Sequence, residues 1–365
     1  MTDAISGFWV ATPTPLTARG TVDPARLADH ARRLFKKGVN GVVLFGTTGE
    51  GTSFNVAERV ATVEALLKAG VAADRIGIGG GFPAITDSIA LTRSVLSLGL
   101  RHVLLLPPYF DRSITPDGIE DALAAIFDGA ADDRLRAYLY HIPQVSGVAV
   151  PTQVAASLRK RYGKLVAGLK DSSGDFKQFQ AFRAAAPELA ITVGNEADIT
   201  RAIAAGGAGT ICGMANVVPE LVKGMIDGKD VEQRMQAAID VVVKTPSLVA
   251  TLKAILAAQT GDAGWLARTS AAVRAVGWHR TEGEDRRADE PRNRLTRERT
   301  LFAARNDRRA RSASLRQKLL ISSAHRSAGP MPATLRSTWS SDAMLRRPSR
   351  ASSINSSSAC AEQTA

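Results

Sequence analysis

Cysteines and long apolar runs are scarce in this chain, and each shortage excludes a class of protein. Cys212 and Cys360 are too few for a disulfide framework or for the cysteine clusters of structural zinc sites. No apolar run approaches the roughly 18 residues that span a bilayer, and the start, MTDAISGFWV, lacks the cationic and apolar stretches of a secretory signal. The five histidines show no spacing typical of a metal site. We therefore expect a cytoplasmic protein that needs neither a membrane nor a metal.

Acidic residues are in short supply only near the end of the chain. Residues 265–365 contain 20 Lys and Arg against 9 Asp and Glu, whereas residues 1–264 are almost neutral, with 27 basic and 26 acidic side chains. The last part is also rich in serine and has lost the apolar periodicity of the first, which is typical of disorder. We predict one globular domain over 1–264 and a basic tail over 265–365.

Three explanations of the tail remain open. It is a basic arm for nucleic acid or another polyanion, a solvated extension, or a segment translated out of frame beyond about residues 262–275. Past Trp265 the only aromatic side chains are those of Trp278, Phe302 and Trp339, so the interleaved stacking residues of a single-strand binder are missing. The third explanation is favoured, because GC-rich coding sequence read out of frame yields Arg, Ser, Ala and Pro in excess. Nucleic acid is therefore not an expected partner.

Short apolar segments alternate with amphipathic ones through the first 260 residues. Each apolar segment is apolar almost throughout, as strands covered on both faces are. The candidate strands are residues 8–12, 41–45, 75–79, 102–106, 137–141, 165–170, 190–194 and 209–212.

The segments between these strands carry helix signals. The first has Asp23 as its N-cap, Pro24 at the first helical position and Gly38 just beyond its end. Eight strand–helix units favour an α/β fold of the (β/α)₈ TIM-barrel type, with further helices over 217–260 packed outside it. An open doubly wound sheet is the alternative. Its main support, the glycine cluster at 77–81, lacks dinucleotide-binding spacing and indicates a tight turn after a strand.

In a barrel of this kind, chemistry belongs at the carboxyl ends of the strands. Lys170 ends an otherwise apolar strand, so its amine is expected to be buried at the barrel mouth, where burial favours a neutral amine able to attack a carbonyl. A lysine that reaches the rim or pairs with Asp171 is the alternative. Tyr140 ends the preceding strand and offers a phenol for proton transfer. His141 beside it either contacts substrate hydroxyls or belongs to the core.

The loop GTTGEG at 46–51 offers two hydroxyls and several backbone N–H groups, which suit a small carboxylate. A plain strand-to-helix turn is the alternative, and Glu50 is expected to satisfy backbone donors within that turn. An amine, a phenol and a carboxylate-binding loop converging on one barrel mouth predict an enzyme.

The order of GTTGE, PPY, YHIPQVSG (140–147) and GLKDSSG (168–174) resembles the dihydrodipicolinate synthase/N-acetylneuraminate lyase family of pyruvate-dependent class I aldolases. The resemblance runs from about Trp9 to Gly261. It implies a TIM barrel, usually assembled as a dimer of dimers, that works without a cofactor. It also implies a Schiff base on Lys170 and proton transfer by Tyr140.

The resemblance extends to the groups that hold the substrate. It implies that Thr47 and Thr48 bind the pyruvate carboxylate, with Thr47 also in the proton relay. Tyr109 and Ile211 are the other residues expected to contact substrate.

Two departures narrow the expected substrate. The arginine that dihydrodipicolinate synthases usually carry after the catalytic tyrosine is replaced by Val145, and the tyrosine donated across the dimer is replaced by Phe110. Without that arginine a dianionic product is held poorly. We therefore predict a lyase acting on pyruvate and an aldehyde, such as a 2-keto-3-deoxy sugar acid aldolase.

Several other functions stay open. A 4-hydroxy-tetrahydrodipicolinate synthase and a 2-oxo acid dehydratase would use the same scaffold. An inactive aldolase relative is a further reading, and a polyanion-binding scaffold that acts through the basic tail belongs to a different class.

Overall fold

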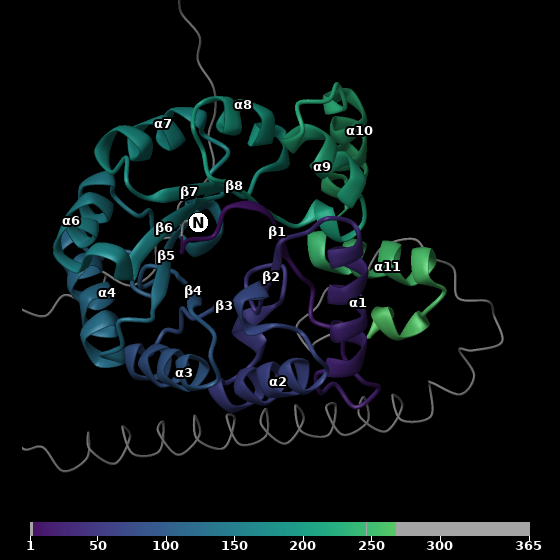
Figure 1. The fold of residues 1–365 in the computed structure, drawn as a ribbon, viewed down its shortest axis with the longest axis horizontal. Helices are drawn as coiled ribbons and strands as arrows, with labels where there is room; N and C mark the ends of the chain where they lie inside the picture. The colour runs from purple at the N-terminus through teal and green to yellow at the C-terminus, as the bar shows by residue number, and fades with distance from the viewer. Residues whose placement is uncertain (1–2, 246, 268–365) are drawn as a thin grey trace, which may run out of the picture. The chain divides into compact units, whose positions relative to one another are not determined.

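The computed structural model describes residues 3–245 and 247–267 of the chain. Here eight parallel strands close into a barrel in sequence order, with β8 paired to β1 (Figure 1). The strands are β1 (Gly7–Ala11), β2 (Gly41–Leu44), β3 (Ile76–Gly79), β4 (His102–Leu105), β5 (Arg136–His141), β6 (Val166–Asp171), β7 (Ala190–Val193) and β8 (Gly209–Cys212). Each overlaps its predicted segment, so the predicted TIM barrel is confirmed and the open doubly wound sheet is wrong. From residue 268 on, the predicted tail lies outside the described residues.

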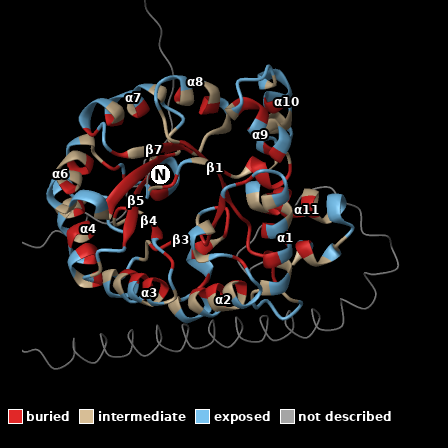
Figure 2. Ribbon diagram, viewed as in Figure 1, coloured by how far each residue is buried: buried red, intermediate tan, exposed pale blue. Residues whose placement is uncertain are grey.

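Helices surround the barrel and turn their buried faces toward it (Figure 2). The signals at the first helix act as predicted: the Asp23 side chain accepts from the backbone N–H of Arg26, and Gly38 has a φ of 87°. The helices are α1 (Pro24–Lys36), α2 (Val56–Lys68), α3 (Ile85–Ser97), α4 (Pro116–Ala130), α5 (Pro143–Ser146), α6 (Thr152–Tyr162), α7 (Phe176–Ala185), α8 (Ile199–Ala204), α9 (Pro219–Ile226), α10 (Glu232–Val243) and α11 (Leu248–Thr260).

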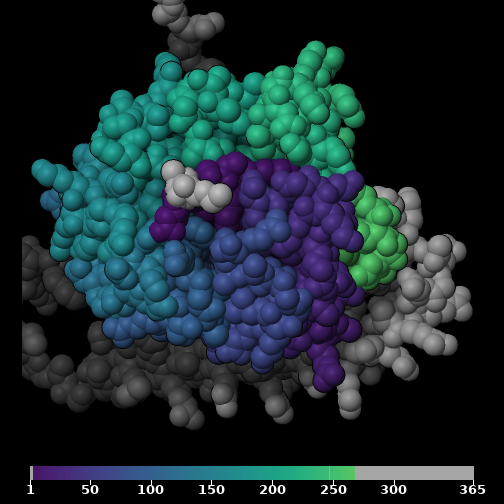
Figure 3. All heavy atoms as spheres, viewed as in Figure 1, coloured from purple at the N-terminus to yellow at the C-terminus, as the bar shows by residue number. Residues whose placement is uncertain are grey.

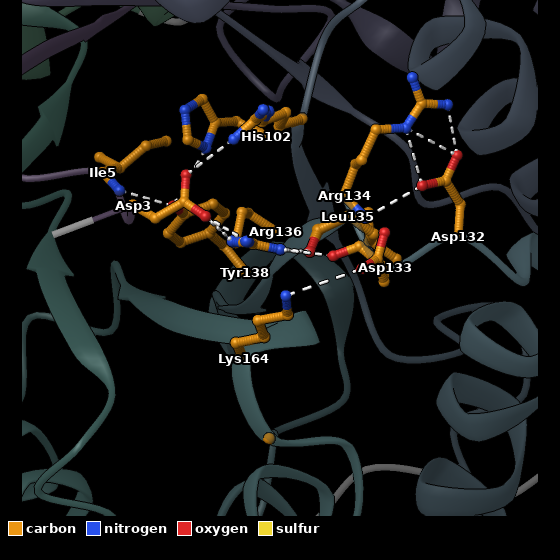
Figure 4. Close-up of polar contacts among 12 residues, drawn as sticks. Asp3, Ile5, His102, Asp132, Asp133, Arg134, Leu135, Arg136, Tyr138 and Lys164 are labelled. Carbon is orange, nitrogen blue, oxygen red and sulfur yellow. Dashed lines mark hydrogen bonds and ion pairs between the residues drawn. The ribbon is translucent and has the colours of Figure 1, made fainter.

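The segment before β1 closes the amino-terminal end of the barrel. The backbone N–H of Ile5 donates to the Tyr138 hydroxyl at 2.5 Å, and that hydroxyl lies 3.1 Å from Nδ1 of His102 (Figure 4). Asp3 forms an ion pair with Arg136 beside them. In the space-filling view the purple N-terminal segment reaches the centre of this face (Figure 3). Polar groups are thus satisfied at the closed end, and the opposite end remains for a binding site.

The glycine cluster at 77–81 serves close packing instead of the predicted tight turn. None of its glycines has a positive φ. A Cβ on Gly79 would clash with the carbonyl oxygen of Phe45, and one on Gly80 would lie 2.5 Å from Cγ1 of Val103. The end of β3 is therefore pressed against its neighbours on both sides, where only glycine fits.

The helices predicted over 217–260 are α9, α10 and α11. After α11, Trp265 packs its indole edge-on against His30 of α1, with 5.1 Å between ring centres. Among the described residues no single helix is long and apolar enough to cross a bilayer. The pair α10 and α11 meets that test by length and composition only, with a bend of 112° between the two helices.

Candidate active site

A cavity of about 190 Å³ opens at the carboxyl ends of the strands. Ala11, Val43 and Leu104, which belong to the apolar interior of the barrel, line its inner part. The loops after β2 and β4 and the ends of β5 and β6 form its walls. Side chains able to donate or accept protons line it as well: Thr47, Glu50, Thr52, Arg59, Tyr109, Tyr140, Ser146 and Lys170.

Lys170 and Tyr140 are paired across β6 and β5. Both side chains are buried, and Nζ of Lys170 lies 4.3 Å from the centre of the Tyr140 ring. Burial alone would raise the pKa of Tyr140, but the positive charge of Lys170 and hydrogen bonds with Ser172, Thr47 and Lys170 lower it overall. This phenol therefore gives up its proton more readily than an ordinary tyrosine, as an acid–base group beside an amine must.

The turn at 46–51 has an unusual backbone. Phe45 comes just before it and Glu50 lies within it, and each has a φ of 54°, in the left-handed region that residues with side chains rarely adopt. A Cβ on Gly51 would clash with the carbonyl oxygen of Phe45, so the close approach of the two ends requires glycine. The turn is thus a specific, tightly folded structure and more than a simple link between strand and helix.

Arg59 of α2 holds this turn from the protein side. Its buried guanidinium donates to the carbonyl oxygens of Gly51 at 2.5 Å, Gly79 at 2.6 Å and Phe54 at 3.3 Å. It also lies 4.0 Å from the centre of the Phe82 ring. Burial lowers the pKa of Arg59 to about 10, which leaves it charged at neutral pH. One cation therefore joins the turn, the start of α2 and the end of β3 into one wall of the cavity.

Thr47 and Thr48 point in different directions. Thr47 lines the cavity and helps to lower the pKa of Tyr140, whereas Oγ1 of Thr48 lies 3.5 Å from the place of a Cβ on Gly213, and Thr48 does not line the cavity. Within the described residues, the backbone N–H groups of both threonines donate to no protein acceptor. Such a pair of N–H groups suits a carboxylate, so Thr48 can serve through its backbone.

Glu50 makes a longer-range contact than the sequence predicts. Its carboxylate pairs with the ammonium of Lys253, which is buried on α11. The two residues are 203 positions apart, and the contact brings the last long helix of the described chain to the cavity turn.

The other predicted residues are divided between the cavity and the core. Tyr109 lines the cavity, and burial raises the pKa of its phenol although the charge of Arg59 lowers it. Ile211 is fully buried inside the barrel and does not line the cavity. His141 faces away from the barrel axis: its Nδ1 accepts from the N–H of Val150, and its ring packs against Phe182. The core position that the sequence left open for His141 is the one it occupies.

Three residues complete the surroundings of Lys170 without having been assigned a role from sequence. Ser172 helps to lower the pKa of Tyr140, and a Cβ on Gly194 would clash with Ser172 and lie 3.0 Å from Cε of Lys170. Glu196 accepts from the N–H groups of Gly213 at 3.0 Å and Met214 at 2.8 Å. Burial raises the pKa of Glu196, while these hydrogen bonds and Lys170 oppose the rise. Their positions after β6 and β7 are the only sequence signal for them.

The sequence matches the model of the Dihydrodipicolinate synthetase family over residues 4–261. The chain belongs to this family. It is 36% identical over 250 residues to an uncharacterized DapA-like lyase of Chloroflexus aurantiacus, an alignment that covers 66% of this chain and 83% of that protein. It is 30% identical over 226 residues to the 4-hydroxy-tetrahydrodipicolinate synthase of Shewanella pealeana, covering 61% of this chain and 74% of that one.

A solved member of the Dihydrodipicolinate synthetase family has the same barrel. The crystal structure of dihydrodipicolinate synthase from Agrobacterium tumefaciens superposes with a TM-score of 0.71 at 32% identity and covers 78% of this chain and 96% of that one. Membership of the Dihydrodipicolinate synthetase family supports a lyase activity, and the family resemblance drawn from the sequence motifs is confirmed.

Proposed function

We propose that the protein is a class I lyase that forms a Schiff base between Lys170 and a 2-oxo acid. The observation that supports this most directly is the buried amine of Lys170 against the Tyr140 ring, 4.3 Å from its centre, in a cavity that also receives Thr47. An amine, a phenol and a hydroxyl within reach of one small molecule are the groups that imine chemistry needs.

In the proposed cleavage, Tyr140 takes a proton from Lys170, and the free amine attacks C2 of the 2-oxo acid. The carbinolamine loses its hydroxyl as water, with Tyr140 returning the proton, and an iminium remains. The C4 hydroxyl then gives its proton to Tyr140 and the C3–C4 bond breaks. The bonding electrons pass to the iminium, which becomes an enamine, and the aldehyde leaves. Tyr140 then returns its proton to C3 of the enamine, and attack of water on the resulting iminium releases pyruvate and regenerates Lys170.

The backbone N–H groups of Thr47 and Thr48 hold the carboxylate of the 2-oxo acid in this proposal, and Thr47 passes protons to Tyr140. No step calls for a metal or an organic cofactor. We propose a 2-keto-3-deoxy sugar acid or a related 2-oxo acid as substrate, because Val145 lines the cavity where a cation would be needed for a dianionic partner.

The test is reduction with borohydride in the presence of pyruvate. The proposal expects pyruvate mass on the peptide that contains Lys170, and none on Lys170→Met. Folded protein that gains no mass would refute the Schiff base. Screening 2-keto-3-deoxy acids for pyruvate release then identifies the aldehyde.

A 4-hydroxy-tetrahydrodipicolinate synthase is the second candidate, supported by the names of the Shewanella and Agrobacterium relatives. It would use the same imine but condense pyruvate with an aldehyde that carries a carboxylate. Condensation faster than cleavage of every sugar acid tested would favour it. Loss of water from a 3-deoxy-2-oxo acid without pyruvate release would indicate a dehydratase instead.

We also propose that the protein assembles as a dimer of dimers in the cytoplasm. Phe110 is 87% exposed beside Tyr109, an unusual position for a large apolar side chain on an isolated subunit. Sedimentation of the full chain tests this: a monomer at micromolar concentration would refute it.

A further inference from the structure

The ion pair between Lys253 and Glu50 is almost completely enclosed. The side chain of Lys253 is 3% exposed and that of Glu50 is 12% exposed. Lys253 comes from α11, which packs outside the barrel, while Glu50 lines the cavity. The ion pair therefore connects α11, in the outer helix layer, to the wall of the active site.

Glu50 occupies the position in the turn that sets the place of Thr47. Its backbone N–H donates to the carbonyl oxygen of Thr47 at 3.2 Å, and the next N–H, of Gly51, donates to Gly46 at 3.1 Å. Its own backbone is left-handed, which costs free energy unless surrounding contacts hold it. The ammonium of Lys253 supplies such a contact on the side chain.

The turn also lies next to the reacting groups. Thr47 and Tyr140 line the same cavity, Thr47 is one of the groups that lower the pKa of Tyr140, and Tyr140 faces Lys170. Neighbouring groups thus extend from α11 through Glu50 and the turn to the cavity that holds the amine.

Buried ion pairs seldom add stability compared with an apolar pair of the same size, because both charges lose their water. They do fix the direction of both side chains. At this place a fixed direction matters, since a displacement of about 1 Å at a proton-transferring group can cost a hundredfold in rate.

We propose that Lys253 is a positioning residue of the active site: by holding Glu50 it fixes the turn that presents Thr47 to Tyr140. Helix α11 then contributes to catalysis by positioning the turn. This inference rests on the proposed Schiff-base function.

The experiment compares four variants of the full chain: Lys253→Met, Glu50→Gln with Lys253→Met, Lys253→Arg, and Asp262→Asn. The double variant removes both charges of the pair together, so neither of these two charges is left buried without the other. Asp262 is the matched control. It pairs with Arg26 at 2.6 Å and so also ties the end of the described chain to α1, but it lies outside the cavity.

The readouts are the rate of borohydride-trapped pyruvate adduct at saturating pyruvate, its pH profile and the thermal midpoint. Lys253→Met and the folded double variant are expected to lose between about tenfold and a hundredfold in trapping rate. Their profiles should move to higher pH, because the hydrogen bond from Thr47 is one of the groups that lower the pKa of Tyr140. Lys253→Arg should recover part of the rate, and Asp262→Asn should match the unmodified protein.

A folded double variant with the unmodified rate and pH profile would overturn the inference while leaving the Schiff base intact. An equal loss in Asp262→Asn would also overturn it, since general loosening of the C-terminal helices would then explain the effect. Absence of any adduct in the unmodified protein would overturn the proposed function, and this inference with it.

Discussion

Tyr138 and Tyr140 lie two residues apart on the same face of β5 and have opposite electrostatic surroundings. Burial raises the pKa of Tyr138 at the closed end of the barrel, where its hydroxyl accepts from Ile5. At the open end the charge of Lys170 and several hydrogen bonds outweigh burial and lower the pKa of Tyr140. One strand therefore carries two phenols, one suited to structure and the other to proton transfer.

Replacing Tyr140 by Phe should remove proton transfer while leaving the fold intact. Loss of a general acid–base group costs about a hundredfold to ten-thousandfold in rate. We expect kcat for pyruvate release to fall by that amount, with a smaller change in thermal midpoint. Steady-state kinetics on a cleaved 2-keto-3-deoxy acid, beside a thermal melt, measures both.

Tyr138→Phe is the matched control, because it deletes the same hydroxyl from the same strand. It leaves the Ile5 N–H without its buried acceptor, at a cost of about 1–3 kcal/mol in free energy of unfolding. Its kcat should stay near that of the unmodified protein. Equal losses of kcat in both variants would contradict the distinction between the two tyrosines.

A methyl group at Gly194 should disturb the amine directly. A Cβ there would clash with Ser172 and lie 3.0 Å from Cε of Lys170, so both side chains must move. We expect Gly194→Ala to reduce the rate of adduct trapping by about tenfold or more.

Gly213→Ala provides the comparison at the end of β8. The atoms nearest to a Cβ placed on Gly213 belong to Thr48 and Leu252 and lie 3.5 and 3.8 Å from it, which is ordinary van der Waals contact. This variant should trap pyruvate at the unmodified rate. A Gly194→Ala variant that also does so would show that Lys170 has room to adjust.

The buried His102 makes stability depend on acidity. Burial lowers its pKa from 6.5 to about 4 in the folded protein. Between those two values the unfolded chain binds a proton that the folded chain does not, so the free energy of unfolding falls as pH drops from about 6.5 to 4. The full loss is on the order of 3 kcal/mol from this one group.

His102→Asn should flatten that part of the stability curve, because asparagine does not titrate there. Urea unfolding at several pH values from 7 to 4.5 gives the slope for both proteins. An unchanged difference between them across this range would mean that His102 has the same pKa in the folded and the unfolded chain, contrary to its burial.

The barrel, and the places of Lys170 and Tyr140 at its mouth, could be predicted because the sequence signals for them are local. Each strand is short, apolar on both faces and bounded by turn residues, so its end can be located within a residue or two. Lys170 and Tyr140 both stand at such ends, and parallel strands bring their ends to one edge.

The contacts that hold the turn could not be read in this way. Arg59 and Lys253 each lie on a helix, where a single cation normally faces solvent, and both are instead buried. Their partners are carbonyl oxygens and a carboxylate brought near only by closure of the barrel. Phe45, shortly before Thr47 and Thr48, has a left-handed backbone, and no feature of the sequence predicts that conformation at an aromatic residue.

Val145 tests the choice of aldehyde. It lines the cavity and is 58% exposed, so an arginine there reaches solvent and should be tolerated. A guanidinium at the cavity favours an aldehyde that bears a carboxylate through a charge-assisted hydrogen bond of about 1.5 kcal/mol or more, equivalent to about tenfold in kcat/KM. We therefore expect Val145→Arg to raise kcat/KM for carboxylate-bearing aldehydes relative to neutral ones. Val243→Arg, at a valine on α10 that is 67% exposed, should leave that ratio unchanged. The unmodified protein could already prefer the charged aldehyde, with no further gain in Val145→Arg. Another cation would then bind the aldehyde's carboxylate, and this outcome would contradict the sugar acid assignment and favour the synthase.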